Sequence, residues 1–207
     1  FGIFERLLNP TECKTKGIEF ADSITVDFHK WLNVPYDAGA IFTRHQNLLV
    51  QSCDVNAPYL SNGDGIPAFL SMGIENSRRF RALPIWFTLL RYGREGIKTW
   101  VEKNITLAAE LANWISDHPN FELALECQLN VVVFRPLLPD LTNEQADKLT
   151  RTFMEEINKA GVIFLSAGNW QERQMIRAAL SNWQTSEADI ELAKKSMQAT
   201  FDKLANQ

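Results

Sequence analysis

The chain has 207 residues, of which 45% are hydrophobic and 22% are charged, and its formal net charge is -4. These values are ordinary for a globular protein with one sizeable core or slightly more than one. Charges of both signs are interspersed and form no basic face, so nucleic-acid binding is disfavoured. No apolar run reaches the roughly 18 residues that cross a bilayer, which makes a cytoplasmic protein without a membrane partner the default expectation.

Three cysteines, Cys13, Cys53 and Cys127, are odd in number and widely spaced. This pattern fits neither a disulfide framework nor a metal site, so free thiols are expected. The first residue is Phe1 rather than Met, which leads us to expect that the sequence is the later part of a longer chain.

Two short, apolar, β-branched segments, residues 24–28 and 38–43, predict strands that are separated by turn residues. Residues 51–76 are rich in Asn, Gly, Asp, Pro and Ser and predict a long loop. Loops of this length inside a compact domain are usually functional or mobile.

Helical spacing of apolar residues begins at Arg78 and ends at Gly93, with Pro84 marking either the start of the helix or a kink. Residues 95–117 predict a long amphipathic helix. The later elements alternate: strands near 121–126 and 130–135, a helix over 143–160 after a Thr142 cap, strands near 162–166 and 175–180, and a helix from Ser186, which has a capping pattern.

This order predicts an α+β unit in which helices cover one face of an antiparallel sheet. A boundary near residues 93–96 would separate part of an α/β domain, residues 1–94, from a smaller C-terminal domain, residues 95–207.

Lys30 lies between the first two predicted strands, with His29 before it and Trp31 after it. Burial between strands would lower the pKa of this amine and turn it into a nucleophile that can form a Schiff base. A plainer interpretation places Lys30 at a strand end with its ammonium in solvent, as most lysines are. These residues alone leave both interpretations open.

The segment A-D-S-I-T-V-D-F-H-K-W-L, residues 21–32, resembles the cofactor-lysine segment of the pyridoxal-phosphate-dependent (group II) amino-acid decarboxylases. This family includes the aromatic-amino-acid and glutamate decarboxylases. Three further segments resemble the family in the same order, so the resemblance covers essentially the whole chain as the C-terminal half of such an enzyme. It implies the α/β fold-type I architecture, which is aspartate-aminotransferase-like, with part of the large domain followed by an α+β small domain.

The resemblance implies that Lys30 carries pyridoxal 5'-phosphate as a Schiff base and that His29 and Asp27 lie near the cofactor phosphate. C-D-V-N-A-P-Y-L, residues 53–60, is similar to the mobile catalytic loop of the aromatic-amino-acid decarboxylases. In that place Tyr59 would return a proton to the carbanion after carbon dioxide leaves.

The segment N-S-R-R-F-R-A-L, residues 76–83, resembles a family segment at the dimer interface. Ser77 would approach the phosphate of the partner subunit, where many relatives have Gly. The three arginines that follow could equally serve in ion pairs and helix-end contacts. M-I-R-A-A-L-S-N-W, residues 175–183, is similar to the segment whose arginine forks onto the substrate α-carboxylate, which implies this role for Arg177.

The activity that the resemblance implies is that of a homodimeric carboxy-lyase, which converts an L-amino acid to the amine and carbon dioxide. Residues before Phe1 would supply the aspartate on the pyridine nitrogen and the ring stacked on the cofactor, so the N-terminal half of the same enzyme is an expected partner. The alternatives are a catalytically inert fragment, or oxidative deamination or carbon–carbon lyase chemistry with the same lysine. Tyr59 favours decarboxylation, because some aldehyde-forming relatives have Phe there.

Overall fold

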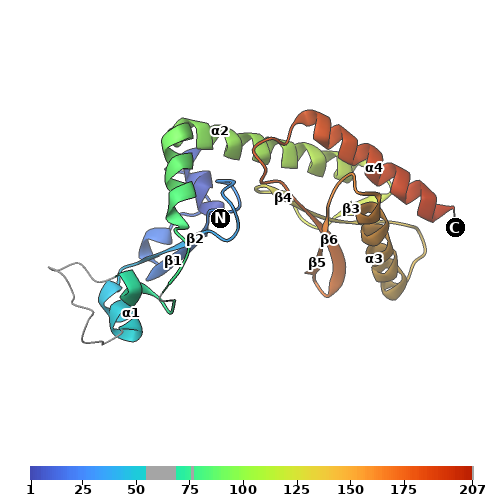
Figure 1. The fold of residues 1–207 in the computed structure, drawn as a ribbon. Coiled ribbons are helices and arrows are strands. Elements are labelled where there is room, and N and C mark those ends of the chain that lie inside the picture. Colours follow the sequence, from blue (N-terminus) through green and yellow to red (C-terminus); the bar gives the residue numbers. More distant parts are fainter. Residues whose placement is uncertain (55–68, 76, 207) are drawn as a thin grey trace. The chain divides into compact units, whose positions relative to one another are not determined.

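The structure is a computed structural model that describes residues 1–54, 69–75 and 77–206 (Figure 1). The chain divides into two compact units. Unit 1 holds Phe1 and Ile3–Ile97, and unit 2 holds Gly2 and Lys98–Gln207. The point of division falls inside the long helix α2 (Ala82–Asp117). No helix in the described part of the chain is long and apolar enough to cross a membrane.

Unit 1 contains a two-stranded antiparallel sheet made of β1 (Ser23–Asp27) and β2 (Gly39–Thr43). Both predicted strands are confirmed to within one residue at each end. The sheet is accompanied by the helix α1 (Gln46–Cys53) and by short 3₁₀ helices, η1 (Gly2–Leu7), η2 (Ile18–Phe20) and η3 (Phe69–Met72). The predicted loop over 51–76 is therefore wrong at its start and near its end.

The apolar character of the two predicted strands does not lead to burial of most of their residues. On β2, Ile41 and Phe42 are 54% and 53% exposed, and β1 has one buried residue, Val26. The connection between the strands is the buried part instead, because Trp31 and Leu32 are 0% and 1% exposed. A two-stranded sheet offers little surface to pack against, so the core of unit 1 forms around the connecting segment.

Helix α2 begins at Ala82, so Pro84 lies in its first turn, where a missing backbone N–H breaks no helical hydrogen bond. The observed start lies four residues after Arg78, where the helical spacing begins, and two residues before Pro84, the alternative start. The predicted break at Gly93 is confirmed, since this residue has a φ of 59° and a ψ of -169° inside the helix. Only glycine adopts such a backbone readily, and the helix bends there.

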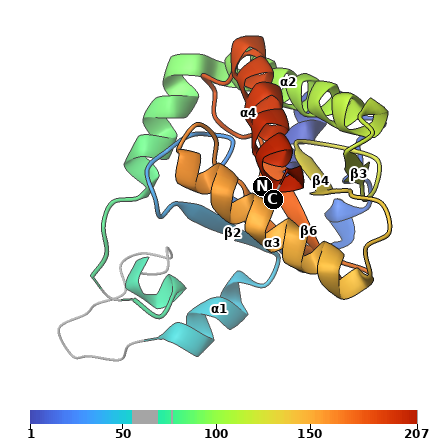
Figure 2. The same ribbon diagram turned by 90° about the vertical axis from the view of Figure 1, so that its right-hand side faces the viewer.

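Unit 2 is the predicted α+β unit. Its four strands form an antiparallel sheet in the order β3-β4-β6-β5. Helices α3 (Asn143–Ala160) and α4 (Glu187–Ala205) lie in front of β4 and β6 in Figure 2. The strands are β3 (Phe121–Leu123), β4 (Val131–Pro136), β5 (Ser166–Trp170) and β6 (Arg173–Ala179).

The start of α3 follows the predicted cap. Thr142 accepts a hydrogen bond from the backbone N–H of Gln145, whose side chain accepts one in return from the N–H of Thr142. Ser186 and Asp189 form the same reciprocal pattern at α4. Such caps satisfy backbone donors that have no partner within the helix, which is why the helix starts could be predicted.

The predicted strand over 162–166 is wrong for four of its five residues, because β5 begins at Ser166. Asn158 of α3 bonds both the N–H and the C=O of Leu165, each at 2.8 Å, and so replaces strand pairing there. The turn from β5 to β6 consists of Gln171 and Glu172, with φ angles of 47° and 61°. Turns of this kind favour Asn and Gly, so the sequence gives no turn signal at this point.

The core of unit 2 is centred on aromatic side chains. Phe121 of β3 contacts the rings of Phe134, Phe153 and Phe201 at centroid distances of 6.1, 5.7 and 5.7 Å. Phe134 and Phe153 are fully buried. The residues of α2, α3, α4 and the sheet therefore share one core.

Phe153→Ala should lower the free energy of unfolding by about 3–5 kcal/mol, because it leaves a cavity in this core. Phe164→Ala is the matched control, since the Phe164 side chain is 83% exposed. That change should alter stability by less than about 0.5 kcal/mol. Urea unfolding followed by circular dichroism measures both, and similar losses in the two variants would contradict the assignment of the core.

Candidate functional site

Lys30 lies in the turn directly after β1, and backbone hydrogen bonds hold this turn on both sides of the lysine. The N–H groups of Phe28 and His29 both donate to the carbonyl oxygen of Ala38, at 2.9 and 3.2 Å. The N–H of Asn33 donates to the carbonyl oxygen of Lys30 at 3.0 Å. Asn33 has a φ of 52°, a left-handed conformation that Asn tolerates better than most residues. The backbone position of Lys30 is therefore fixed.

Trp31 anchors the turn in the core of unit 1. Its side chain is fully buried, and its ring meets the edge of Phe1 at a centroid distance of 5.5 Å. Its indole Nε1 has no hydrogen-bond partner among the described residues. An anchor of this size next to Lys30 limits how far the turn can move.

The Lys30 ammonium donates a hydrogen bond to Asp27 Oδ2 at 2.5 Å, and the two side chains are 37% and 33% exposed. It also lies 4.8 Å from the centre of the Phe1 ring. The hydrogen bond from Lys30 lowers the pKa of Asp27 below its ordinary value, and burial opposes this in part. Lys30 is thus partly exposed at the end of a strand, and the structure pairs its side chain with Asp27 rather than leaving it in solvent alone.

The His29 ring is fixed in orientation by two contacts. Its Nδ1 accepts a hydrogen bond from the N–H of Ala38 at 3.1 Å, and its ring stacks on Tyr36 at a centroid distance of 4.1 Å. Because Nδ1 accepts, the proton of a neutral imidazole lies on Nε2 in this geometry. His29 therefore offers Nε2 as a hydrogen-bond donor.

Ser77 lines a groove of about 1030 Å³ between β2 and the start of α2. Asp37 lies in the same groove and accepts hydrogen bonds from Arg79 Nη2 at 2.6 Å and Arg81 Nε at 3.0 Å. These bonds, first that from Arg81, lower the pKa of Asp37 to about 2. Lys30 does not line this groove, so the described residues do not bring Ser77 and Lys30 together.

The ion pairs of Arg79 and Arg81 match the alternative that the sequence left open for these arginines. Arg81 also lies 3.5 Å from Glu75. Asp37 was not identified from the sequence as the partner of these arginines. Asp37, in the segment Y-D-A-G, is the first acidic residue after the lysine turn. The arginines follow it by 42 and 44 residues, a separation at which sequence spacing carries no information about contact.

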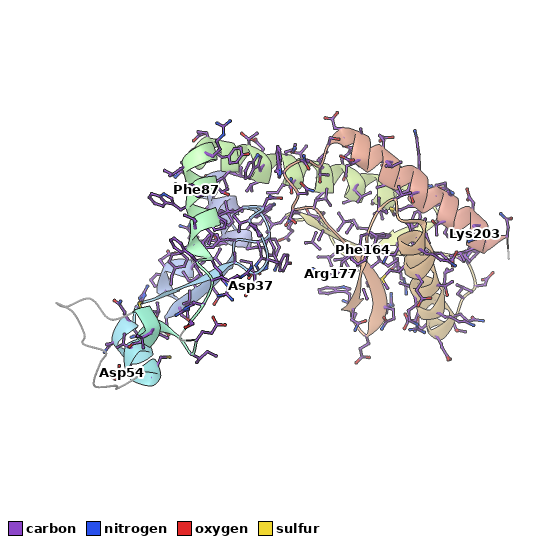
Figure 3. The ribbon with its side chains drawn as sticks, viewed as in Figure 1. Asp37, Asp54, Phe87, Phe164, Arg177 and Lys203 are labelled. Carbon is purple, nitrogen blue, oxygen red and sulfur yellow. The ribbon has the colours of Figure 1, made fainter. Side chains whose placement is uncertain are left out.

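Arg177 belongs to β6 in unit 2, where it pairs with Val133 of β4 and with Ser166 of β5. Its neighbours Ile176 and Ala178 are buried, whereas Arg177 is exposed on the other face of the strand (Figure 3). The arginine is therefore available to a ligand. Tyr59, the predicted proton donor, lies outside the described residues.

Comparison with known proteins identifies the family. Residues 7–137 match the pyridoxal-dependent decarboxylase conserved domain, and the chain belongs to this family of pyridoxal-dependent decarboxylases. It is 29% identical over 180 residues to the aromatic-L-amino-acid decarboxylase of Bacillus atrophaeus, with 84% of this chain and 38% of that protein covered. It is 31% identical over 177 residues to the histidine decarboxylase of Homo sapiens, with 84% and 26% covered.

Solved structures show the same fold. The crystal structure of Oryza sativa TDC with PLP and tryptamine has a TM-score of 0.84 at 25% identity, over 92% of this chain and 40% of that one. Mouse CSAD has a TM-score of 0.83 at 20% identity, over 95% and 43%. The fold-type I architecture is thereby confirmed. The chain spans 38% and 26% of the two curated relatives.

Removal of the Lys30 ammonium should raise the pKa of Asp27. Lys30→Met keeps the apolar stem but loses the hydrogen bond that lowers this pKa, so the value should return toward 3.8. A carbon-detected NMR titration of the Asp27 carboxyl measures the shift. Lys16→Met, at an exposed lysine outside this pair, is the control and should leave the Asp27 titration in place. An unchanged pKa of Asp27 in Lys30→Met would show that the pair does not form.

Asp37 should make stability depend on acid pH. Its pKa is about 2 in the folded chain against an ordinary value of 3.8, so the folded state favours the ionised carboxyl. This contribution is fully present above pH 3.8 and is lost as the pH falls through 2. Asp37→Asn should therefore destabilise the chain at neutral pH, and its difference from wild type should shrink between these two pH values. Urea unfolding at a series of pH values tests this, and a constant difference would refute it.

Proposed function

We propose that the chain is the lysine-bearing part of an enzyme that removes the carboxyl group of an L-amino acid and releases the amine and carbon dioxide. The observation that carries this proposal is the Lys30 side chain, partly exposed on a turn that hydrogen bonds and Trp31 hold in place. The family supports the same chemistry, since the relatives named above act as decarboxylases of aromatic amino acids and of histidine.

The residues around Lys30 fit pyridoxal 5'-phosphate, the cofactor of this family. The Lys30 side chain is 37% exposed, and an unprotonated amine can bond to an aldehyde carbon. Asp27 lies beside this amine and accepts a hydrogen bond from Nζ. When bound, the cofactor supplies a sink for the electron pair that is left when carbon dioxide departs.

We place His29 near the cofactor phosphate, because its ring is already oriented with Nε2 as a donor. Asp27 remains in the proposed cofactor-binding set, although a carboxylate repels a phosphate unless a cation or proton intervenes. Lys30 is its cation in this structure. Ser77 would reach the phosphate bound to a second subunit, since its groove does not include Lys30.

Arg177 is the proposed partner of the substrate carboxylate. A guanidinium can donate two parallel hydrogen bonds to a carboxylate and thereby fix its direction, which a lysine cannot do. Tyr59 is the proposed donor of the proton that replaces the carboxyl group. An inert fragment, and deamination or carbon–carbon cleavage with the same lysine, are the competing functions.

We further propose that residues 1–94 belong to the cofactor-binding large domain and residues 95–207 to the small domain of a homodimer. The first half of α2 supports a partner, because it presents several large apolar side chains (Figure 3). Trp86, Phe87 and Leu90 are 59%, 59% and 63% exposed. Exposed apolar areas of this kind mark interaction sites, here with a second subunit or with the N-terminal half of the enzyme. A cytoplasmic location stays a prediction.

Borohydride reduction in the presence of pyridoxal phosphate tests the role of Lys30. Peptide mass mapping should find one modified lysine, Lys30, and Lys30→Ala should abolish the modification while Lys16→Ala keeps it. The intact mass, recorded on the same sample, shows how much chain is present. Labelling spread over surface lysines would overturn the proposal.

Product analysis separates the competing functions. Unreduced protein that has been loaded with pyridoxal phosphate should release carbon dioxide and an amine from an amino acid. Aldehyde with ammonia would indicate deamination, and a cofactor site without any turnover would indicate an inert fragment.

A further inference from the structure

A glycine lies in the middle of β5, an edge strand of the unit 2 sheet. Gly168 pairs with Met175 of β6, and its φ is not positive, so the backbone itself does not require glycine here. Glycine weakens a strand interior, and it often marks a place that another group approaches closely. A neighbouring side chain explains this position.

That neighbour is Arg177. A Cβ built on Gly168 would lie 2.9 Å from both Cγ and Cδ of Arg177, which is closer than real Cβ contacts allow. The next atom is the carbonyl oxygen of Met175 at 3.9 Å, an ordinary contact. Arg177 pairs directly with Ser166, two residues before Gly168, so its stem runs diagonally over the edge strand. The space that a Cβ would fill is therefore occupied by the stem of this arginine.

We propose that Gly168 is a positioning residue, whose missing Cβ lets the Arg177 stem cross β5 and so aims the guanidinium at the substrate carboxylate. This inference rests on the proposed role of Arg177. The atoms in conflict are Cγ and Cδ, which join the guanidinium group to Cβ. Their displacement carries the whole guanidinium with it, whereas a bidentate pairing requires a fixed direction.

Gly168→Ala in the full-length enzyme should raise the KM for the amino acid by about 10- to 100-fold, the scale on which small misplacements act. The affinity for the product amine, measured by the change in cofactor absorption, should stay within about twofold, because the amine has no carboxylate for Arg177 to bind. Asn169→Ala, at the adjacent exposed residue, is the matched control and should change neither value.

A double-mutant comparison isolates the contact. In Arg177→Ala the stem atoms are absent, so both atoms that lie 2.9 Å from a methyl group at position 168 are removed, and the next nearest atom is the Met175 carbonyl oxygen at 3.9 Å. Gly168→Ala should then add no further loss of amino-acid binding to Arg177→Ala. In the 207-residue chain it should raise the midpoint of thermal unfolding in the Arg177→Ala background, because alanine suits a strand better than glycine.

Two results would overturn the assignment of Gly168 alone: normal discrimination between amino acid and amine in Gly168→Ala, or a double mutant that binds the amino acid more weakly than Arg177→Ala. If Arg177→Ala itself leaves that discrimination unchanged, the carboxylate role of Arg177 fails, and the inference fails with it. The unfolding midpoints still report the steric contact in that case, so the two failures are distinguishable.

Discussion

The burial of the segment that joins β1 and β2 is the constraint on which the candidate site depends. Two strands alone make a weak sheet, and here Trp31, Leu32, Val34 and Ala38 of the connecting segment are buried together with Val26 of β1. Trp31 packs inward, which leaves the preceding residue at the surface with its backbone held by the bonds of the turn. Such an arrangement suits a reactive side chain, because its backbone is held in place while the side chain keeps access to solvent.

The hydrogen bond from Lys30 Nζ to Asp27 Oδ2 makes the charge of one residue depend on the other. This bond is the largest cause that lowers the pKa of Asp27. Any change at the Lys30 nitrogen that breaks the bond would therefore let the pKa of Asp27 rise toward its ordinary value.

Short-range sequence signals predicted most of the helices and strands. They failed where contacts between residues far apart in the sequence determine the backbone conformation. The start of α3 and the break at Gly93 follow from caps and from glycine, which act within a few residues. The apolar run before Ser166 resembles a strand, but Asn158 takes its backbone bonds. The resemblance of the lysine segment lies in the sequence, whereas its pairing with Asp27 and the contact between Gly168 and Arg177 depend on the tertiary fold.

The turn between β5 and β6 holds two residues, Gln171 and Glu172, in left-handed conformations that cost such side chains about 1–2 kcal/mol each. Selection for stability alone would replace them with Asn and Gly. The turn is separate from the strand position of Arg177. Substitutions in the turn can therefore change the free energy of unfolding of unit 2 while the arginine stays in place. Substitutions in this turn could therefore stabilise unit 2 without moving the arginine of the proposed ligand contact.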